Sequence, residues 1–408
     1  MTEHIEVRGA REHNLKDISL RIPKRRITIF TGVSGSGKSS LVFDTIAAEA
    51  QRQLHEHFSQ FVRSFLPAVR QPDADAIEHL GLAVVVDQQR LGGGPRSTVG
   101  TVTDISALVR RLFARAGRSS AGARIDGYSI DDVSAMAVGD LIPVLRLMDG
   151  PIASPLIAPL IERLSRVAAI GLDYLSLDRA TDTLSGGEAQ RVKLLKHLGS
   201  SLEDVIYLLD EPSTGLHPRD VHRLTELLVT LRDKGNTVLV VEHDPDVIRI
   251  ADHVVDMGPG AGTAGGEVVF AGSYADLCNS ATLTGRSLDR VAPIKAAFRA
   301  PTGWIPIRDA RVHNLRGVDV DIPTGVMTVI TGVAGSGKSS LIEGAFLPAH
   351  PDAIVIDQAA IRTSTRSNPA TYTGIMDSIR AAFAAANGVD ASLFSFNSTG
   401  ACETWVTV

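Results

Sequence analysis

The clearest pattern of apolar and polar positions lies in the middle of the chain. An apolar run, Val205–Asp210, ends in an acid, and a second apolar run covers Thr237–Glu242. A longer segment of mixed polarity, Val221–Asp233, separates them. Short apolar runs are typical of buried strands, and the longer segment suits a helix. Strand, helix and strand in this order predict an α/β fold with a mostly parallel sheet covered by helices.

The sequence also contains a repeat. The stretch from Ile5 to Leu41 aligns without a gap with 305–341, so that Lys38 matches Lys338 at an offset of 300 residues. The alignment resumes with Gln88 against Gln358, at an offset of 270, and the second copy is therefore 30 residues shorter in between. Such a long period indicates domain duplication rather than a solenoid. The second copy stops soon after Phe396, without the later strands.

Each copy carries a glycine-rich loop, GVSGSGKS at 32–39 and GVAGSGKS at 332–339. Apolar runs that we expect to be strands, Ile27–Thr31 and Thr328–Thr331, precede the loops, and helical starts follow them. In this context backbone N–H groups and a helix N-terminus hold phosphates, and the lysine reaches the β- and γ-phosphates of ATP. Two loops at matching repeat positions make a chance match negligible. The predicted ATP-binding residues are Gly32, Ser34, Gly35, Gly37, Lys38, Ser39, Ser40, Gly332, Gly335, Gly337, Lys338, Ser339 and Ser340.

Acidic side chains end the strand predicted at Val205–Asp210. Asp210 is expected to hold Mg²⁺ together with Ser39, with Ser339 as the ligand at the second loop, and Glu211 to polarise the attacking water. The alternative is an ordinary strand that ends in an acidic turn. His243 follows the next strand, where it can contact a γ-phosphate, although a lone histidine is more often a satisfied polar residue. A helix preceded by Leu184-Ser185-Gly186-Gly187-Glu188 offers an anion-binding N-terminus.

The order of P-loop, Gln88, LSGGE, LLDEP and His243 resembles the ABC ATPases. The stretches REHNL, PRSTVGTVTDI, LSGGEAQR, LDEPSTGLHPRD and ADHVVDMGPGAG look like the UvrA family, which recognises DNA damage in bacterial nucleotide excision repair. TRSNPATYTG and FSFN look like the family's second half. The resemblance adds Gln88 as a catalytic residue beside Glu211 and His243, Gln358 as an ATP contact, and 184–188 as the signature. It implies a helical signature subdomain, and antiparallel strands at the start of each copy.

The sequence departs from the family at its zinc modules and insertions. GRSSAG at Gly117–Gly122 stands where cysteines are expected, and Trp405 replaces one cysteine of the pair that would include Cys402. We therefore expect no zinc. Only about 70 residues separate Phe113 from Leu184, too few for both a UvrB-binding domain and a DNA-contacting insertion domain. The missing domain argues against an interaction with UvrB.

Composition places few further limits on function. The net charge of the 408 residues is −5, so any surface for DNA must be local. Two cysteines, no signal peptide and no long apolar stretch suit a cytoplasmic protein without a membrane span. The basic candidates for DNA contact could equally form solvated helix faces, and they are Arg63, Arg70, Arg110, Arg111, Arg115 and Arg118.

We therefore expect a first ABC domain at 1–278 with a short insert near 119–159, a linker at 279–301, and the front part of a second domain at 302–408. The leading hypothesis is a UvrA-like ATPase that uses ATP and Mg²⁺, binds DNA and takes part in damage recognition. The alternatives are a regulatory or drug-resistance module without repair activity and a degenerate, poorly folding product. Lys38 has no second signature opposite it, whereas Lys338 can face the signature at 184–188. A homodimer would complete the first site.

Overall fold

The computed structural model describes residues 3–67, 69–87, 96–116, 124–148, 153–198, 202–288, 293–333, 335–356 and 368–394. The chain divides into two compact units, Met1–Ala345 and Phe346–Val408. This division falls at a different place from the expected domain boundaries, which stay a prediction. No helix of the described residues is both long and apolar enough to cross a membrane.

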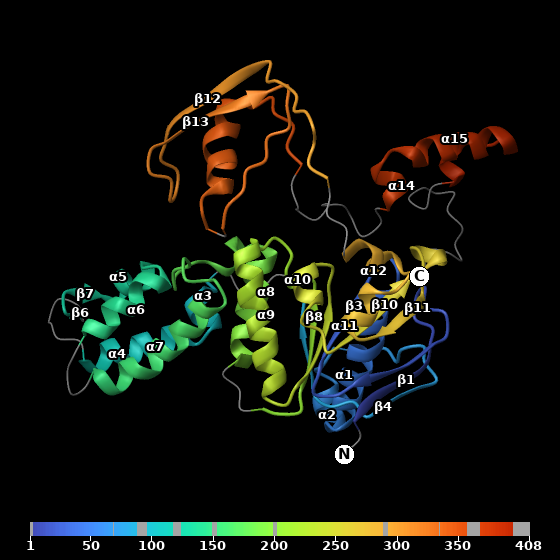
Figure 1. Ribbon diagram of the computed structural model, residues 1–408, viewed down its shortest axis with the longest axis horizontal. Helices are drawn as coiled ribbons and strands as arrows, with labels where there is room; N and C mark the ends of the chain where they lie inside the picture. The colour runs from blue at the N-terminus through green and yellow to red at the C-terminus, as the bar shows by residue number, and fades with distance from the viewer. Residues whose placement is uncertain are drawn as a thin grey trace. The chain divides into compact units, whose positions relative to one another are not determined.

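A six-stranded sheet forms the centre of the larger unit (Figure 1). Its strands lie in the order β11-β10-β3-β9-β8-β5. All neighbours are parallel except β10 and β11, which are antiparallel. The sheet confirms the predicted α/β fold. The strands are β3 (Ile27–Gly32), β5 (Ala83–Val86), β8 (Ile206–Asp210), β9 (Thr237–Val241), β10 (His253–Gly258) and β11 (Glu267–Gly272).

The central strands are buried on both faces, as parallel strands covered by helices require. β3 and β9 are buried throughout, and β8 is buried up to Asp210. The predicted helix at 221–233 is α9 (Pro218–Asp233), which starts three residues earlier because Pro218 suits a first helical position. A short helix, α10 (Pro245–Ile248), follows β9, and α11 (Tyr274–Cys278) and α12 (Leu283–Leu288) follow β11.

A small antiparallel sheet opens the chain, as expected from the family resemblance. It contains β1 (His4–Ala10), β2 (Ile18–Pro23) and β4 (Ala76–Glu78) in the order β2-β1-β4. A helical segment follows β3 and the first glycine-rich loop, and it runs through η1 (Ser40–Ala47), α1 (Ala48–Glu56) and α2 (Gln60–Arg63). Ile5, Ile22 and Phe30 form part of the shared core of the two sheets.

The chain from Val99 to Leu198 forms a helical subdomain. It contains α3 (Val99–Val102), α4 (Ile105–Ala116), β6 (Arg124–Ile125), β7 (Tyr128–Ser129), α5 (Ile130–Ala135), α6 (Val138–Leu147), α7 (Ser154–Ala169) and α8 (Gly186–Leu198). Where it is described, the expected insert near 119–159 contributes β6, β7, α5 and α6 to this subdomain.

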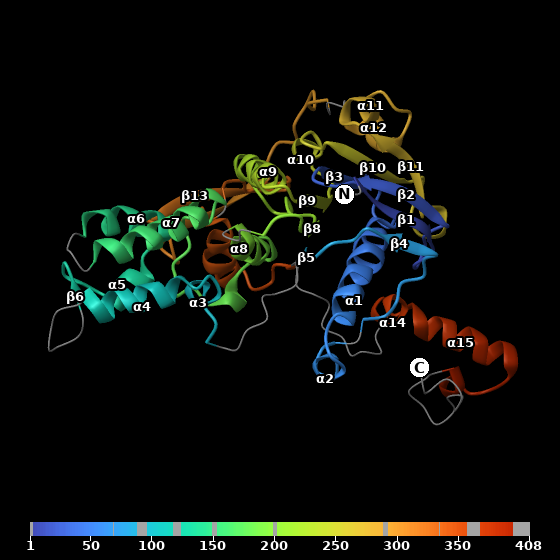
Figure 2. The same cartoon turned by 90° about the horizontal axis from the view of Figure 1, so that it is seen from below.

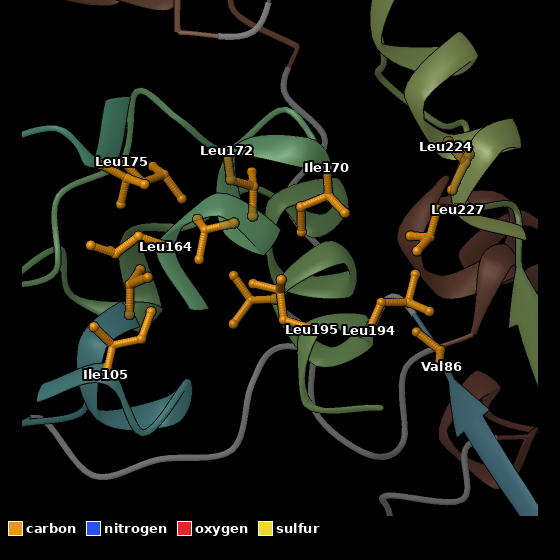
Figure 3. Packing of buried hydrophobic residues seen from close by; sticks show 14 of the residues in the cluster. Val86, Ile105, Leu164, Ile170, Leu172, Leu175, Leu194, Leu195, Leu224 and Leu227 are labelled. Atoms are coloured by element: carbon orange, nitrogen blue, oxygen red, sulfur yellow. The ribbon is translucent and has the colours of Figure 1, made fainter. Parts of the chain in front are cut away.

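Helix α8 joins this subdomain to the central sheet through two faces (Figure 3). Leu195 points toward the subdomain, where Ile170 and Leu164 lie, whereas Leu194 points toward Val86 of β5 and Leu227 of α9. All six side chains are buried in one continuous core. The signature at the start of α8 is therefore held by the packing of both neighbours.

The second copy repeats only part of this arrangement. Strands β12 (Gly303–Ala310) and β13 (Val318–Thr324) pair antiparallel like β1 and β2, and η4 (Ser340–Phe346) follows the second loop. The predicted strand at Thr328–Thr331 is wrong, because these residues form no strand and Met327 and Val329 are 88% and 66% exposed. The matching run in the first copy is a strand because β9 and β10 flank it, and a strand needs such partners.

The smaller unit is helical where it is described. It contains α13 (Leu347–Ala349), α14 (Pro369–Tyr372), α15 (Ile375–Asn387) and η5 (Ala391–Phe394). At the repeat offset, α15 corresponds to α4 of the first copy. The α4 residues Ile105 and Val109 are buried, but their counterparts Ile375 and Ile379 are 56% and 40% exposed. The apolar stripe is thus repeated in α15, where these two side chains are exposed.

Candidate nucleotide site

Parallel pairing brings the predicted site residues to one edge of the sheet. β3 pairs with β9, and β9 pairs with β8, all in parallel, so the three strands end on the same side. The glycine-rich loop follows β3, Asp210 and Glu211 follow β8, and His243 follows β9. Ligands bind at the carboxyl ends of parallel strands in such open sheets. The predicted constellation is thus assembled in one place from segments far apart in the sequence.

The first glycine-rich loop has the conformation of a phosphate cradle. Gly32 and Gly37 have φ angles of 126° and 104°, which residues with a side chain rarely adopt. A Cβ atom at Gly32 would lie 2.0 Å from the carbonyl oxygen of Met257. Ser34 and Gly35 are exposed at the outside of the turn. Without side chains at these glycines, the backbone N–H groups of the loop can approach a bound triphosphate closely.

Lys38 is held inside this loop. It is 5% exposed, and its Nζ donates to the carbonyl oxygens of Gly32 (3.0 Å) and Val33 (2.9 Å). Burial lowers the pKa of the ammonium group, and the nearby carboxylates of Glu211, Asp256 and Asp210 oppose that shift. The site therefore combines the positive charge of Lys38 with three nearby carboxylates. Ser39 is exposed at the start of η1, where its hydroxyl is free to face a metal-bound phosphate.

Asp210 has the surroundings of a metal ligand. Burial raises the pKa of its carboxyl group, and the charge of Glu211 raises it further. A divalent cation would relieve both effects, because it stabilises the ionised form. Together with Ser39, Asp210 therefore fits Mg²⁺ bound to a nucleotide. The described residues contain no group of three or more His, Cys, Asp or Glu side chains that could hold a metal, and the expected absence of zinc stays a prediction.

Glu211 adopts an unusual backbone conformation beside His243. Its φ angle is 41°, and its N–H donates to the carbonyl oxygen of Val241 (2.8 Å). Left-handed conformations of residues other than glycine cost about 1–3 kcal/mol and cluster at functional sites. His243 Nε2 lies 3.6 Å from Glu211 Oε1. Burial lowers the pKa of the imidazole, and the charge of Lys38 lowers it further, so the neutral ring is favoured.

Glu242 connects the two loops that carry these groups. Its side chain is buried at 1% exposure. Its Oε1 accepts from the N–H of Ser213 (2.8 Å), and its Oε2 accepts from the N–H groups of His243 (2.6 Å) and Asp244 (3.0 Å). The local sequence pattern predicts only that Glu242 ends a strand. Its partner Ser213 is 29 residues away in the sequence, so the local sequence pattern does not predict that hydrogen bond.

Asn14 supports the phosphate loop from outside. Its Nδ2 donates to the carbonyl oxygens of Gly35 (3.1 Å) and Gly262 (3.1 Å). In the second copy, Nδ2 of Asn314 donates in the same way to the carbonyl oxygen of Gly335 (2.6 Å). The two asparagines occupy matching positions of the repeat, at the offset of 300 residues. The duplicated bond shows that the amide belongs to the loop architecture.

The signature is an N-capped helix start. The N–H of Ser185 donates to Glu188 Oε2 (2.8 Å), and the N–H of Glu188 donates to Ser185 Oγ (3.3 Å), which makes a capping box. Tyr174 donates its hydroxyl to Glu188 Oε1. Burial raises the pKa of the Tyr174 phenol, and Glu188 raises it further. Leu184 is buried, and Gly186 and Gly187 begin α8.

Two polar side chains of α8 tie the signature helix to the sheet. Gln190 is buried, and its Nε2 donates to the carbonyl oxygens of Asp210 (2.7 Å) and Val86 (3.1 Å). Lys193 forms an ion pair with Asp87 (2.5 Å). The position of α8 is therefore coupled to the strand end that carries Asp210.

The second glycine-rich loop keeps the same internal bonds. Lys338 Nζ donates to the carbonyl oxygens of Gly332 and Val333, both at 2.8 Å. Gly337 has a φ angle of 93°, close to that of Gly37. Ser339 is exposed, and Ser340 Oγ lies 3.3 Å from His313 Nδ1. A phosphate cradle therefore forms even where the preceding residues are not a strand.

Several predicted residues lie outside the described part of the chain. Gln88, Gln358, Arg118, Cys402 and the segment Gly117–Gly122 are among them. Their expected roles stay predictions. The other basic candidates are exposed, with Arg63 and Arg70 near α2, and Arg110, Arg111 and Arg115 on α4.

The fold and this constellation define an ATPase of the ABC class. A family model described as ABC transporter matches residues 15–214. The chain belongs to the UvrA family. A solved structure, UvrA2 from Deinococcus radiodurans, is 30% identical, with a TM-score of 0.90 over 98% of this chain and 75% of that chain.

Curated relatives agree with this assignment. UvrABC system protein A of Thermus thermophilus is 42% identical over 320 residues, which is 69% of this chain and 34% of the relative. The protein of the same name from Streptomyces avermitilis is 27% identical over 745 residues, covering 99% of this chain and 74% of the relative. The chain thus spans about a third of the length of the first relative and three quarters of the second.

Proposed function

We propose that this chain binds and hydrolyses ATP with Mg²⁺ and uses the cycle to bind DNA in damage recognition. The observation that carries the proposal is the assembly of Lys38, Asp210 and Glu211 at one edge of the sheet, with His243 beside Glu211. Membership of the UvrA family supports the proposed binding of DNA in damage recognition. A cytoplasmic location follows from the same proposal.

Each group at the site has a distinct task in this proposal. Lys38 and the loop N–H groups bind the phosphates, and Ser39 and Asp210 hold Mg²⁺, which neutralises phosphate charge. Glu211 Oε1 accepts a hydrogen bond from the attacking water and orients it. His243 can donate a ring N–H to a γ-phosphate oxygen. Ser339 holds the metal at the second loop, and Gln88 and Gln358 complete the two sites.

The first site needs a signature from outside its own domain. ABC ATPases close ATP between the phosphate loop of one domain and the signature of another, as the family resemblance implies. A homodimer in which two first domains face each other would supply residues 184–188 to the first loop. Lys338 would face the signature of its own chain.

ATP turnover with and without DNA tests the proposal. We expect slow hydrolysis alone and faster hydrolysis with duplex DNA that contains a bulky lesion, with intact duplex as the control. Hydrolysis that neither DNA changes, together with no DNA binding at low salt, would contradict the DNA part and favour a regulatory module. No hydrolysis under any condition would contradict the ATPase part.

A further inference from the structure

The end of helix α1 carries a surface that the nucleotide site does not use. After α1 ends at Glu56, the chain forms the short helix α2, whose Ser59 Oγ accepts from the N–H of Val62 (3.4 Å). Figure 2 shows α2 at the far end of α1. We name this surface the aromatic tip and define it by Phe58, Phe61, Arg63, Phe65 and Arg70.

The aromatic tip exposes large apolar side chains. Phe61 and Phe65 are each 75% exposed, and Phe58 is 41% exposed. The rings of Phe61 and Phe65 meet edge to face at 5.2 Å, so they contact each other rather than the core. Clustered apolar groups at a surface mark interaction sites, because their burial against a partner is favourable.

The charge of the tip restricts the kind of partner. The sequence contains no acidic residue between His57 and Pro72, although the whole chain carries a net charge of −5. Arg63 and Arg70 are exposed within this stretch. A local excess of positive charge on an acidic protein favours a polyanion.

The repeat shows that the tip is not needed to form a nucleotide loop. The second copy is 30 residues shorter between Lys338 and Gln358, the interval that contains the tip in the first copy. Its loop nevertheless forms the same bonds from Lys338 to Gly332 and Val333. The tip is therefore not required for a glycine-rich loop to form these internal bonds.

We infer that the aromatic tip binds DNA whose bases are accessible, as at a distorted or unpaired site. Exposed rings offer stacking partners for unstacked bases, and arginines between them contact phosphates. Phe61 and Phe65 would contact the bases, and Arg63 and Arg70 the backbone. This inference rests on the proposed DNA binding and adds a surface and a preference for open bases.

Two double variants of the full chain test this surface. Phe61→Ala with Phe65→Ala removes both rings, and Arg63→Ala with Arg70→Ala removes both charges. Val269→Ala and Arg21→Ala serve as matched controls, because both side chains are exposed elsewhere. Fluorescence anisotropy measures binding to a duplex with a three-nucleotide mismatch bubble and to a fully paired duplex of equal length, at several salt concentrations.

The two variants have different expected results. Loss of the rings should reduce affinity for the bubble by about 10-fold or more, the effect of losing one stacked base, and should change affinity for the paired duplex little. Loss of the arginines should weaken binding to both DNAs and lower the slope of log affinity against log salt by about 2. ATP binding and thermal unfolding, measured in parallel, should match those of the wild type.

The remaining outcomes overturn either this inference or the proposed function. Wild-type binding to DNA that neither double variant changes would overturn the tip assignment alone. Loss of self-association in sedimentation, with DNA binding intact, would likewise overturn it and make the tip a protein interface. A wild-type chain that binds no DNA would overturn the proposed function and this inference together.

Discussion

Nε2 of His243 lies 3.6 Å from Oε1 of Glu211. The two residues end neighbouring parallel strands and face each other across the carboxyl edge of the sheet. Glu242 fixes both loops through three backbone N–H groups. The pair is therefore held by the sheet and by a buried carboxylate rather than by the flexible ends of two loops.

Both phosphate loops should bind ATP. Lys38→Ala removes a charge-assisted contact that contributes about 1.5–3 kcal/mol, and Lys338→Ala should act in the same way at the second loop. We expect one site to be lost in each single variant and both in the double variant. Isothermal titration calorimetry with a slowly hydrolysed ATP analogue measures the number of ATP sites and their affinity. Unchanged affinity in the double variant would refute the assignment of both loops.

Asn14 should position the first loop. Asn14→Asp keeps the shape of the side chain but replaces the donor with a carboxylate that faces two carbonyl oxygens. We expect weaker ATP binding at the first loop, by about 10-fold, the effect of a lost hydrogen bond with an unfavourable replacement. Asn314→Asp should weaken the second loop alone. Equal ATP affinity in wild type and Asn14→Asp, with the protein folded, would show that the bond has no role in binding.

Glu242 should control the rate of hydrolysis rather than ATP affinity. Glu242→Gln replaces one acceptor oxygen with an NH₂ group that cannot accept from a backbone N–H, and unsatisfied buried groups cost about 1–3 kcal/mol each. The loops of Glu211 and His243 should lose their mutual position, so kcat should fall by about 10-fold or more while KM changes little. Glu226→Gln, at an exposed position on α9, is the control.

A structural role alone would give a different result for Glu242. A variant that is merely unstable should regain full turnover at low temperature or with a stabilising osmolyte. Persistent loss of kcat in a folded variant supports the positioning role. Recovery to the wild-type rate under those conditions would contradict it.

The local elements could be predicted from the sequence because each leaves a complete local pattern. The glycines and lysine of both loops lie within eight residues, and β8, α9 and β9 follow their periodicities. The strand expected at Thr328–Thr331 failed because an apolar run shows a preference for burial but not whether partner strands are present. The hydrogen bonds of Glu242 and Tyr174 could not be predicted for a related reason. Their partners, Ser213 and Glu188, become neighbours only in the fold.

Turnover should depend on protein concentration if first domains must pair. The specific activity should be low in dilute solution and rise as the dimer forms, with the rise matching sedimentation measured under the same conditions. The physical reason is that, in the proposed dimer, the Lys38 site obtains residues 184–188 from the second chain. A specific activity that stays constant while the protein is monomeric throughout would contradict the dimer mechanism.

The effect of Glu211→Gln on hydrolysis and binding decides whether Glu211 is the catalytic carboxylate. The amide keeps the size of the side chain but removes its charge, so it cannot polarise the attacking water. Single-turnover hydrolysis should fall by about 10²–10⁴-fold, the contribution of a positioned base. ATP affinity, measured on the same protein, should stay within about two-fold of the wild type. If the variant hydrolyses ATP at nearly the wild-type rate, Glu211 only terminates β8, and this account of the site is wrong.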